Sequence, residues 1–115
     1  MKPILPTLRE KKRYLVFEVI SAAKATQEEA FASIQEASKS FMGISTYAKS
    51  GLRLIGKWSS SLQRGVVRVN RRYLDHARAS FCYVQRVGRS KAIVHSVIAS
   101  GSLKKAASHL SRTES

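Results

Sequence analysis

Residues 13–20 read RYLVFEVI, a run of aromatic and β-branched side chains interrupted by one glutamate. Such a run is typical of a strand inside a sheet, and it places a sheet in any fold that the chain can adopt. Side chains alternate between the two faces of a strand. One face of this strand would carry Leu15, Phe17 and Val19, and the other Tyr14, Val16, Glu18 and Ile20.

A helix is expected to follow this strand and to begin at Thr26. Thr26 and Glu29 have the spacing of a capping box, in which each side chain satisfies a free backbone N–H group. Gly43 is a plausible end for this helix. The expected buried stripe consists of Ala30, Phe31, Ile34, Ala37 and Phe41.

The middle of the chain predicts two more strands and a second long helix. Residues 52–58 and 65–69 are expected to form a hairpin, whereas residues 44–50 have no clear pattern. Asn70 is a good N-cap for a helix over residues 71–87, which Gly88 would end. The buried stripe of this helix would be Leu74, Ala77, Phe81 and Val84.

The last part of the chain predicts a fourth strand over residues 91–99 and a short final helix. Ser102 would cap that helix, and Leu103, Ala107 and Leu110 would face inward. The resulting order is that of a split βαβ, ferredoxin-like (RRM-like) α+β sandwich. We therefore expect an antiparallel four-stranded sheet with both long helices on one face. The domain would span residues 13–110, after a basic arm (1–12) and before a short tail (111–115).

Charge is the strongest indication of function. The chain has 21 Lys and Arg residues against 7 Asp and Glu residues, for a formal net charge of +14. After Glu36 the only acids are Asp75 and Glu114. A compact chain with so large an excess of positive charge repels itself unless a polyanion neutralises it. Phosphate backbones are polyanions of this kind. The candidate RNA-binding residues are Lys11, Lys12, Arg13, Arg68, Arg71, Arg72, Arg89, Lys91, Lys104 and Lys105.

The sheet itself does not resemble a base-stacking surface. In RRM domains, a basic residue and a glycine precede alternating aromatic residues, but residues 64–69 read RGVVRV. Val16, Ile20 and Val66 would instead give the open face of the sheet an apolar surface for a protein partner. The alternative is that the N-terminal arm or the final helix covers this face. Trp58 is expected to be packed or at an interface.

Nothing in the sequence predicts a catalytic or metal centre. His76, His95 and His109 lie far apart, and His76 and Cys82 point in different directions on the expected helix. We therefore expect no catalytic residue and no cofactor bound by the protein. The single cysteine favours a reducing compartment, here the cytoplasm. No apolar run is long enough for a membrane span, and a signal peptide is not expected.

Three segments resemble archaeal ribonuclease P protein component 2: LPTLREKKRY (5–14), VRVNRRY (67–73) and SGSLKK (100–105). Their order and spacing agree with that family, and the resemblance covers nearly the whole chain. It implies a ferredoxin-like fold and a role in removing the 5′ leader from precursor tRNA. The catalytic RNA would perform the cleavage with magnesium, which the protein itself does not bind.

The resemblance also implies partners. These are ribonuclease P RNA and ribonuclease P protein component 3, with precursor tRNA as the substrate of the complex. Two pairs of components 2 and 3 can associate into a heterotetramer. The main alternative is an independent RRM-like RNA-binding or ribosome-associated protein, and a further one is a small anion-binding phosphatase on the same fold.

Overall fold

The computed structural model describes residues 11–110, so the expected tail and most of the expected arm lie outside the described residues. The chain forms an antiparallel sheet between two layers of helix. The elements, in chain order, are β1 (Lys12–Ser21), α1 (Gln27–Met42), α2 (Ile44–Ser50), β2 (Arg53–Ser59), β3 (Arg64–Asn70), the 3-10 turn η2 (Arg71–Tyr73), α3 (Leu74–Phe81), β4 (Arg86–Val87), β5 (Ser90–Ser100), α4 (Leu103–Ala107) and the 3-10 turn η3 (Ser108–Leu110).

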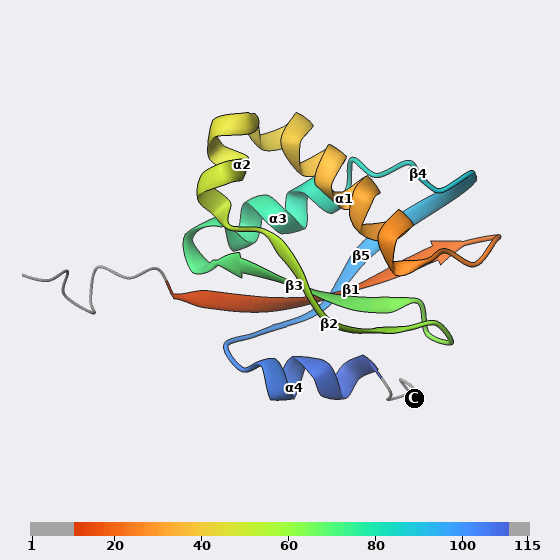
Figure 1. The fold of residues 1–115 in the computed structure, drawn as a ribbon. Helices are drawn as coiled ribbons and strands as arrows, with labels where there is room; N and C mark the ends of the chain where they lie inside the picture. Colours follow the sequence, from red (N-terminus) through yellow and green to blue (C-terminus); the bar gives the residue numbers. More distant parts are fainter. Residues whose placement is uncertain (1–10, 111–115) are drawn as a thin grey trace, which may run out of the picture.

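The sheet has the strand order β2-β3-β1-β5-β4, and every neighbouring pair is antiparallel. Helices α1, α2 and α3 cover one face of the sheet, and α4 lies on the opposite face (Figure 1). The expected antiparallel α/β architecture is confirmed, as is the short C-terminal helix. The expected count of four strands is wrong, because the two-residue strand β4 adds a fifth.

The main core lies between the sheet and α1 and α3. Phe17 on β1 is fully buried, and its ring lies 6.1 Å from those of both Phe81 and Trp58, measured between centroids. A Cβ added at Gly65 on β3 would come within 2.8 Å of the Phe17 ring. The absence of a side chain at residue 65 therefore lets the aromatic cluster pack directly on the sheet.

The first helix has the expected boundaries. The Thr26 hydroxyl accepts a hydrogen bond from the Glu29 N–H at 3.1 Å, and the Glu29 carboxylate accepts one from the Thr26 N–H at 3.0 Å. This reciprocal arrangement is the predicted capping box. Gly43 ends the helix with a φ of +82°, a conformation that glycine adopts without steric cost.

The helix predicted over residues 71–87 is wrong at both ends. A 3-10 turn precedes α3, and α3 ends at Phe81. The chain then turns, which lets Val84 and Val87 reach the core, where they are buried. Gly88, with φ of +62°, does not end a helix but opens the two-residue turn of the β4–β5 hairpin, a position that favours glycine.

Two smaller elements also differ from expectation. Residues 44–50, which had no clear pattern, form α2, and Gly51 closes it in the left-handed conformation. The Ser102 hydroxyl caps α4 as predicted. The prediction for the inward side of α4 is wrong in part. Leu110 is buried as expected, but Leu103 and Ala107 are exposed and Ala106 is buried instead. This short helix contacts the sheet along a different side from the one expected.

We predict that Phe81→Ala lowers the free energy of unfolding by about 3–5 kcal/mol, because it leaves a cavity beside Phe17. Urea denaturation of the purified chain measures this change. Ile44→Ala serves as the control, since Ile44 is 76% exposed, and should change stability by less than about 0.5 kcal/mol. Equal midpoints for Phe81→Ala and the wild-type protein would contradict the packing described.

Candidate nucleic-acid interface

Four strand ends meet at one end of the sheet. Because all pairings are antiparallel, β1 and β2 begin there, and β3 and β5 end there (Figure 1). Arg68 is the register partner of Tyr14 on one side and of Arg53 on the other. We call this region the basic end, after its cations Lys11, Lys12, Arg13, Lys49, Arg53, Arg68, Arg71, Arg72, Lys104 and Lys105.

The predicted RNA-binding residues thus fall into two groups. All of them except Arg89 and Lys91 lie at the basic end. Arg89 and Lys91 belong to the β4–β5 hairpin at the opposite end of the sheet, where Lys91 is the register partner of Arg86. Contact with RNA stays a prediction for both groups, but the fold brings clusters that are distant in sequence onto one surface.

Asn70 ties together the segments of the basic end. Its amide donates to the Lys49 carbonyl at 2.8 Å, and its side-chain oxygen accepts from the Lys12 ammonium. Gly51 packs against the same amide, and the Arg71 N–H donates to the Lys11 carbonyl at 2.7 Å. Asn70 occupies the predicted cap position, but its side chain makes no capping bond. It holds α2, β1 and β3 together instead.

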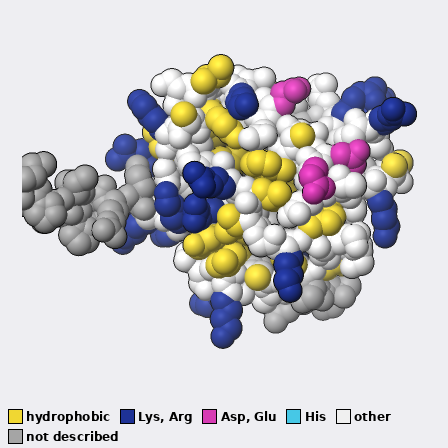
Figure 2. Space-filling model, in the orientation of Figure 1, with side chains coloured by type: hydrophobic (Ala, Val, Ile, Leu, Met, Phe, Trp, Pro, Cys, Tyr) yellow, Lys and Arg dark blue, Asp and Glu magenta, His cyan; other side chains and the backbone are white. Residues whose placement is uncertain are grey.

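The acids of the described chain are engaged or placed elsewhere. Glu18 contacts Arg64 and His95, Asp75 contacts Arg78, and Glu28, Glu29 and Glu36 lie on α1. Within residues 11–110, no ion pair joins Arg53, Arg68 or Arg71 to a carboxylate. Figure 2 shows Lys and Arg side chains gathered where β1 begins, while the acidic side chains on that face lie away from it.

Like charges lie directly opposite each other at the basic end. Arg53 and Arg68 are cross-strand register partners, an arrangement that destabilises a sheet. The Nε atom of Arg68 is buried and finds no hydrogen-bond partner among residues 11–110. A bound anion would relieve the repulsion, since it would screen the two guanidinium groups and accept hydrogen bonds from their accessible N–H groups.

Sequence reasoning did not include Lys49 and Arg53 among the candidate residues. Lys49 is in α2, a segment whose structure was not predicted, and Arg53 begins β2. Neither is part of a basic cluster in the sequence. The predicted hairpin could have indicated Arg53 as a candidate, because antiparallel pairing of residues 52–58 with 65–69 brings Arg53 toward Arg68.

The predicted open apolar face is largely closed. Val16 and Val66 are fully buried, in a cluster with Ala106 and Leu110 from the C-terminal helical segment. The final helix therefore covers this face, which was one of the two expected alternatives. Val16 and Val66 do not form an open surface for a partner. Ile20 is 53% exposed beyond the area that α4 covers. Trp58 is half-buried against Phe17 and so is packed, as expected.

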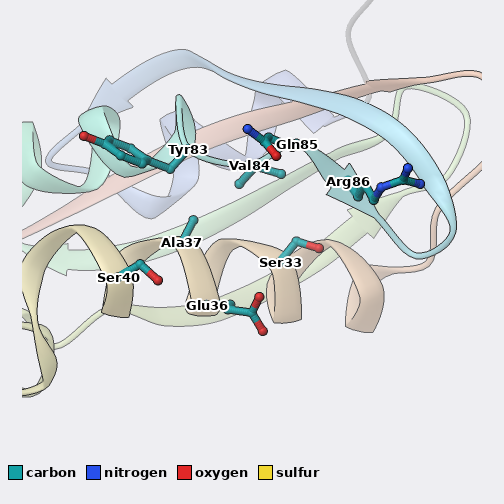
Figure 3. A pocket seen from close by; sticks show the side chains of 8 residues that line it. All are labelled: Ser33, Glu36, Ala37, Ser40, Tyr83, Val84, Gln85 and Arg86. Carbon is teal, nitrogen blue, oxygen red and sulfur yellow. The ribbon is translucent and has the colours of Figure 1, made fainter.

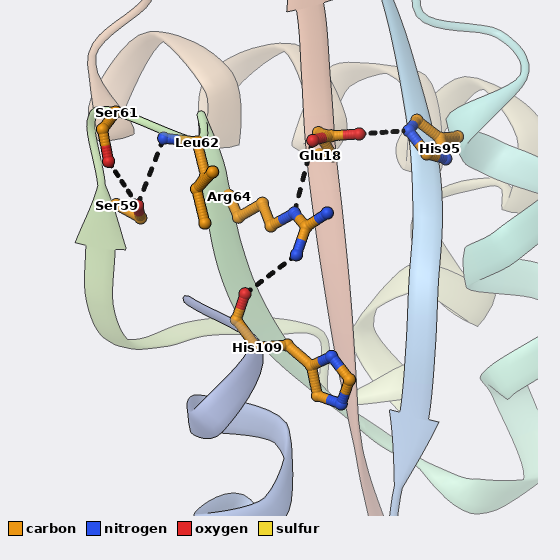
Figure 4. A network of polar contacts seen from close by, with 7 residues as sticks. All are labelled: Glu18, Ser59, Ser61, Leu62, Arg64, His95 and His109. Atoms are coloured by element: carbon orange, nitrogen blue, oxygen red, sulfur yellow. Dashed lines mark hydrogen bonds and ion pairs between the residues drawn. The ribbon is translucent and has the colours of Figure 1, made fainter. Parts of the chain in front are cut away.

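A polar network accompanies the covering helix (Figure 4). The buried Arg64 guanidinium donates to the Glu18 carboxylate at 3.3 Å and to the His109 carbonyl at 3.0 Å. The other Glu18 oxygen lies 2.6 Å from His95 Nε2. A buried cation must be paired to be tolerated. The network therefore neutralises Arg64 and fastens η3 onto the sheet.

The described residues contain neither a candidate metal site nor a candidate membrane span. No group of three or more His, Cys, Asp or Glu side chains in residues 11–110 could hold a metal ion. Across the same residues, no helix has the length and apolar character needed to cross a membrane. Cys82, the one cysteine, is exposed and free.

Comparison with known proteins adds a family to this geometry. Residues 13–111 match the sequence pattern of the Rpp14/Pop5 family. The chain is 35% identical to ribonuclease P protein component 2 of Thermococcus gammatolerans over 90% of its length and 86% of that protein. It is 36% identical to the protein of the same name from Methanococcus vannielii, over 90% and 78% of the two chains.

A solved structure supports the same fold. A chain in the cryo-EM structure of yeast ribonuclease MRP aligns with a TM-score of 0.64 and 17% sequence identity. The alignment covers 83% of this chain and 77% of the yeast chain. At this level of identity, the likeness concerns the arrangement of helices and strands.

We predict that Asn70→Ala lowers the free energy of unfolding by about 1–3 kcal/mol, because it leaves the Lys49 carbonyl and the Lys12 ammonium without this partner. Asn70→Asp should cost less, since a carboxylate still accepts from Lys12 although it cannot donate to the carbonyl. Chemical denaturation measures both changes. Two variants as stable as the wild-type chain would show that Asn70 does not hold the basic end together.

Proposed function

The chain belongs to the Rpp14/Pop5 family, and we infer from its relatives and its fold that it is a protein subunit of ribonuclease P. The relatives that match it over most of their length carry the name ribonuclease P protein component 2. The assembly would remove the 5′ leader from precursor tRNA. This is the function that the sequence segments predicted.

The observation that carries this proposal is the basic end. It collects cations from five segments of the chain onto one surface, where backbone hydrogen bonds and Asn70 hold them in place. Phosphate oxygens would bind there in exchange for released counterions. The protein would thereby offset repulsion between phosphates, so that the RNA folds and retains magnesium at lower magnesium concentrations.

We further propose that the isolated chain does not cleave RNA. General acid–base catalysis needs titratable groups positioned together. In residues 11–110, a cluster of titratable groups joins Glu18, Arg64 and His95, and it serves to attach the C-terminal segment. Magnesium would be held by the RNA, and the protein would work in the cytoplasm without a cofactor of its own.

Component 3 of ribonuclease P is the proposed protein partner. The support is the resemblance to component 2 relatives, together with the apolar side chains that the described fold leaves exposed, among them Ile20 and Ile93. These two are register partners on β1 and β5, 53% and 63% exposed. Association of two such pairs into a heterotetramer is part of the same proposal.

The fold supports the finer ferredoxin-like assignment as well. Without the short strand β4, the order is β2-β3-β1-β5, with α1 between the first two strands of the sequence and α3 between the last two. A split βαβ arrangement places its strands and crossovers in this way. We propose that β4 and α4 are additions to that framework.

For the basic end, we predict that Lys104→Gln with Lys105→Gln weakens binding to ribonuclease P RNA and reduces the slope of log affinity against log salt by about 1.5. The matched control is Lys24→Gln with Lys57→Gln, which removes the same charge from exposed sites outside the basic end. Filter binding over a salt series measures both slopes. Equal slopes for the two double variants would exclude Lys104 and Lys105 from the interface.

For the whole assembly, we predict that leaving out this chain from a reconstitution with ribonuclease P RNA and component 3 raises the magnesium concentration needed to cleave precursor tRNA. The chain alone should produce no cleavage. Unchanged cleavage at low magnesium without the chain would contradict the proposed role. If native purification of the chain recovers ribosomal RNA in place of ribonuclease P RNA, the ribosome-associated alternative holds instead.

A further inference from the structure

A second group of cations lies on the β4–β5 hairpin, at the end of the sheet opposite the basic end. We call Arg86, Arg89 and Lys91 the hairpin cluster. Arg86 and Lys91 are register partners, and Arg89 lies in the turn that joins β4 to β5. All three residues are exposed. Lys and Arg side chains thus gather at both ends of the molecule (Figure 2).

The hairpin cluster is not neutralised from within the domain. Among residues 11–110, no ion pair joins any of its three cations to a carboxylate. The Arg86 guanidinium lies 3.5 Å from the carbonyl of Arg89 instead. Figure 3 shows Arg86 on β4 and Glu36 on the side of α1 that is turned away from it. The charge of the hairpin cluster is therefore available to an anion from outside.

Contacts with the core and with α1 hold the hairpin in place. Val87 and Ala92 are buried, and the Ala92 N–H donates to the Gln85 carbonyl at 3.0 Å. The turn packs on α1, since a Cβ added at Gly88 would come within 2.8 Å of the Glu29 carboxylate. That carboxylate is itself fixed by the capping box of α1. The backbone that carries the three cations is therefore arranged before an anion binds, which reduces the entropy lost on binding.

Strand β5 runs from the hairpin cluster to the basic end. Lys91 is its second residue, and Ser100, its last, is the register partner of Tyr14 at the basic end. A strand rises about 3.3 Å per residue, so the two basic regions are about 25–30 Å apart. At physiological salt, attraction between charges is screened over about 8–10 Å. Each region therefore attracts phosphates independently of the other.

The sheet face between the two regions does not continue the positive charge. Next to the hairpin it carries the exposed pair Ile20 and Ile93. Arg64 follows, but it is buried and already paired with Glu18. Beyond it, the C-terminal helical segment covers Val16. An RNA backbone laid along this face would lose hydration against apolar side chains without gaining a cation. The two regions therefore suit two separate stretches of backbone.

We propose that the chain bridges two segments of RNA, an inference that rests on the proposed function in ribonuclease P. Phosphates of one segment bind at the basic end, and phosphates of the other accept charge-assisted hydrogen bonds from the hairpin cluster. The sheet holds the two segments about 25–30 Å apart. The protein thereby fixes the relative position of two parts of the catalytic RNA, in addition to reducing repulsion within one part.

The test uses the full chain and an RNA duplex of six G·C base pairs, labelled on separate copies with a donor or an acceptor fluorophore. Such a duplex is at most about 20 Å long, so one copy cannot reach both basic regions. Energy transfer reports that two duplexes are held together. It should rise as protein is added and fall again in excess protein, where each duplex occupies its own chain.

Two results of this titration would overturn the proposal. The first is energy transfer that stays at background while anisotropy shows that the duplex is bound. The second is energy transfer that keeps rising in excess protein, because such a signal reports aggregation and not bridging.

A variant assigns the second contact to the hairpin cluster. Arg86→Gln combined with Arg89→Gln and Lys91→Gln should reduce the maximum energy transfer at least about fivefold, because the second duplex loses its phosphate contacts. Its affinity for the first duplex should fall less than about threefold, since screening separates the two regions. Energy transfer equal to that of the wild-type chain would contradict the assignment.

A matched control removes the same charge from exposed sites outside both basic regions. It combines Lys39→Gln, Lys57→Gln and Arg78→Gln. This variant should retain the energy transfer of the wild-type chain. If it loses energy transfer as the hairpin variant does, net charge alone explains the signal and the proposal is wrong.

The outcomes also distinguish this inference from the function beneath it. If the wild-type chain binds ribonuclease P RNA with the predicted salt dependence but never holds two duplexes, the inference fails and the proposed function stands. If the chain binds neither that RNA nor the duplex, both fail. If the hairpin variant loses association with component 3 but bridges duplexes as the wild-type chain does, the hairpin cluster is a protein interface and the inference is overturned.

Discussion

The burial of β1 on both of its faces is the constraint on which the rest of the structure depends. Leu15 and Phe17 pack against the helices, and Val16 packs beneath the C-terminal helix. A shift of register by one residue would exchange the two faces, so the pairing of β1 with β3 and β5 is strongly specified. The same pairing brings Arg68 beside Tyr14 and collects the cations at one end.

The basic end concentrates like charges that would repel one another in the absence of an anion. Burial of apolar side chains in the core supplies stability that offsets this repulsion. Asn70 and the hydrogen bond from the Arg71 N–H to the Lys11 carbonyl hold the local geometry. The cations are therefore arranged before any ligand arrives. Preorganisation of this kind reduces the entropy lost when a polyanion binds.

The position of α4 determines which surfaces remain for partners. By covering Val16 and Val66, and by fastening η3 through Arg64, the C-terminal segment removes the sheet face that RRM domains use for RNA. Among the described residues, the surfaces left open include the end of the sheet with its cations and the exposed pair Ile20 and Ile93.

The sequence by itself determined the features that depend on near neighbours: the strand of residues 13–20, the capping box of Thr26 and Glu29, the cap at Ser102 and the excess of positive charge. Only the tertiary structure decided where α3 ends, that α4 covers Val16, and that Lys49 and Arg53 join the basic end. A helix cap, or the alternation of side chains along a strand, depends on residues that are near neighbours in the sequence. The choice between helix and extended backbone at Val84 and Val87 instead rests on what packs against them from distant segments.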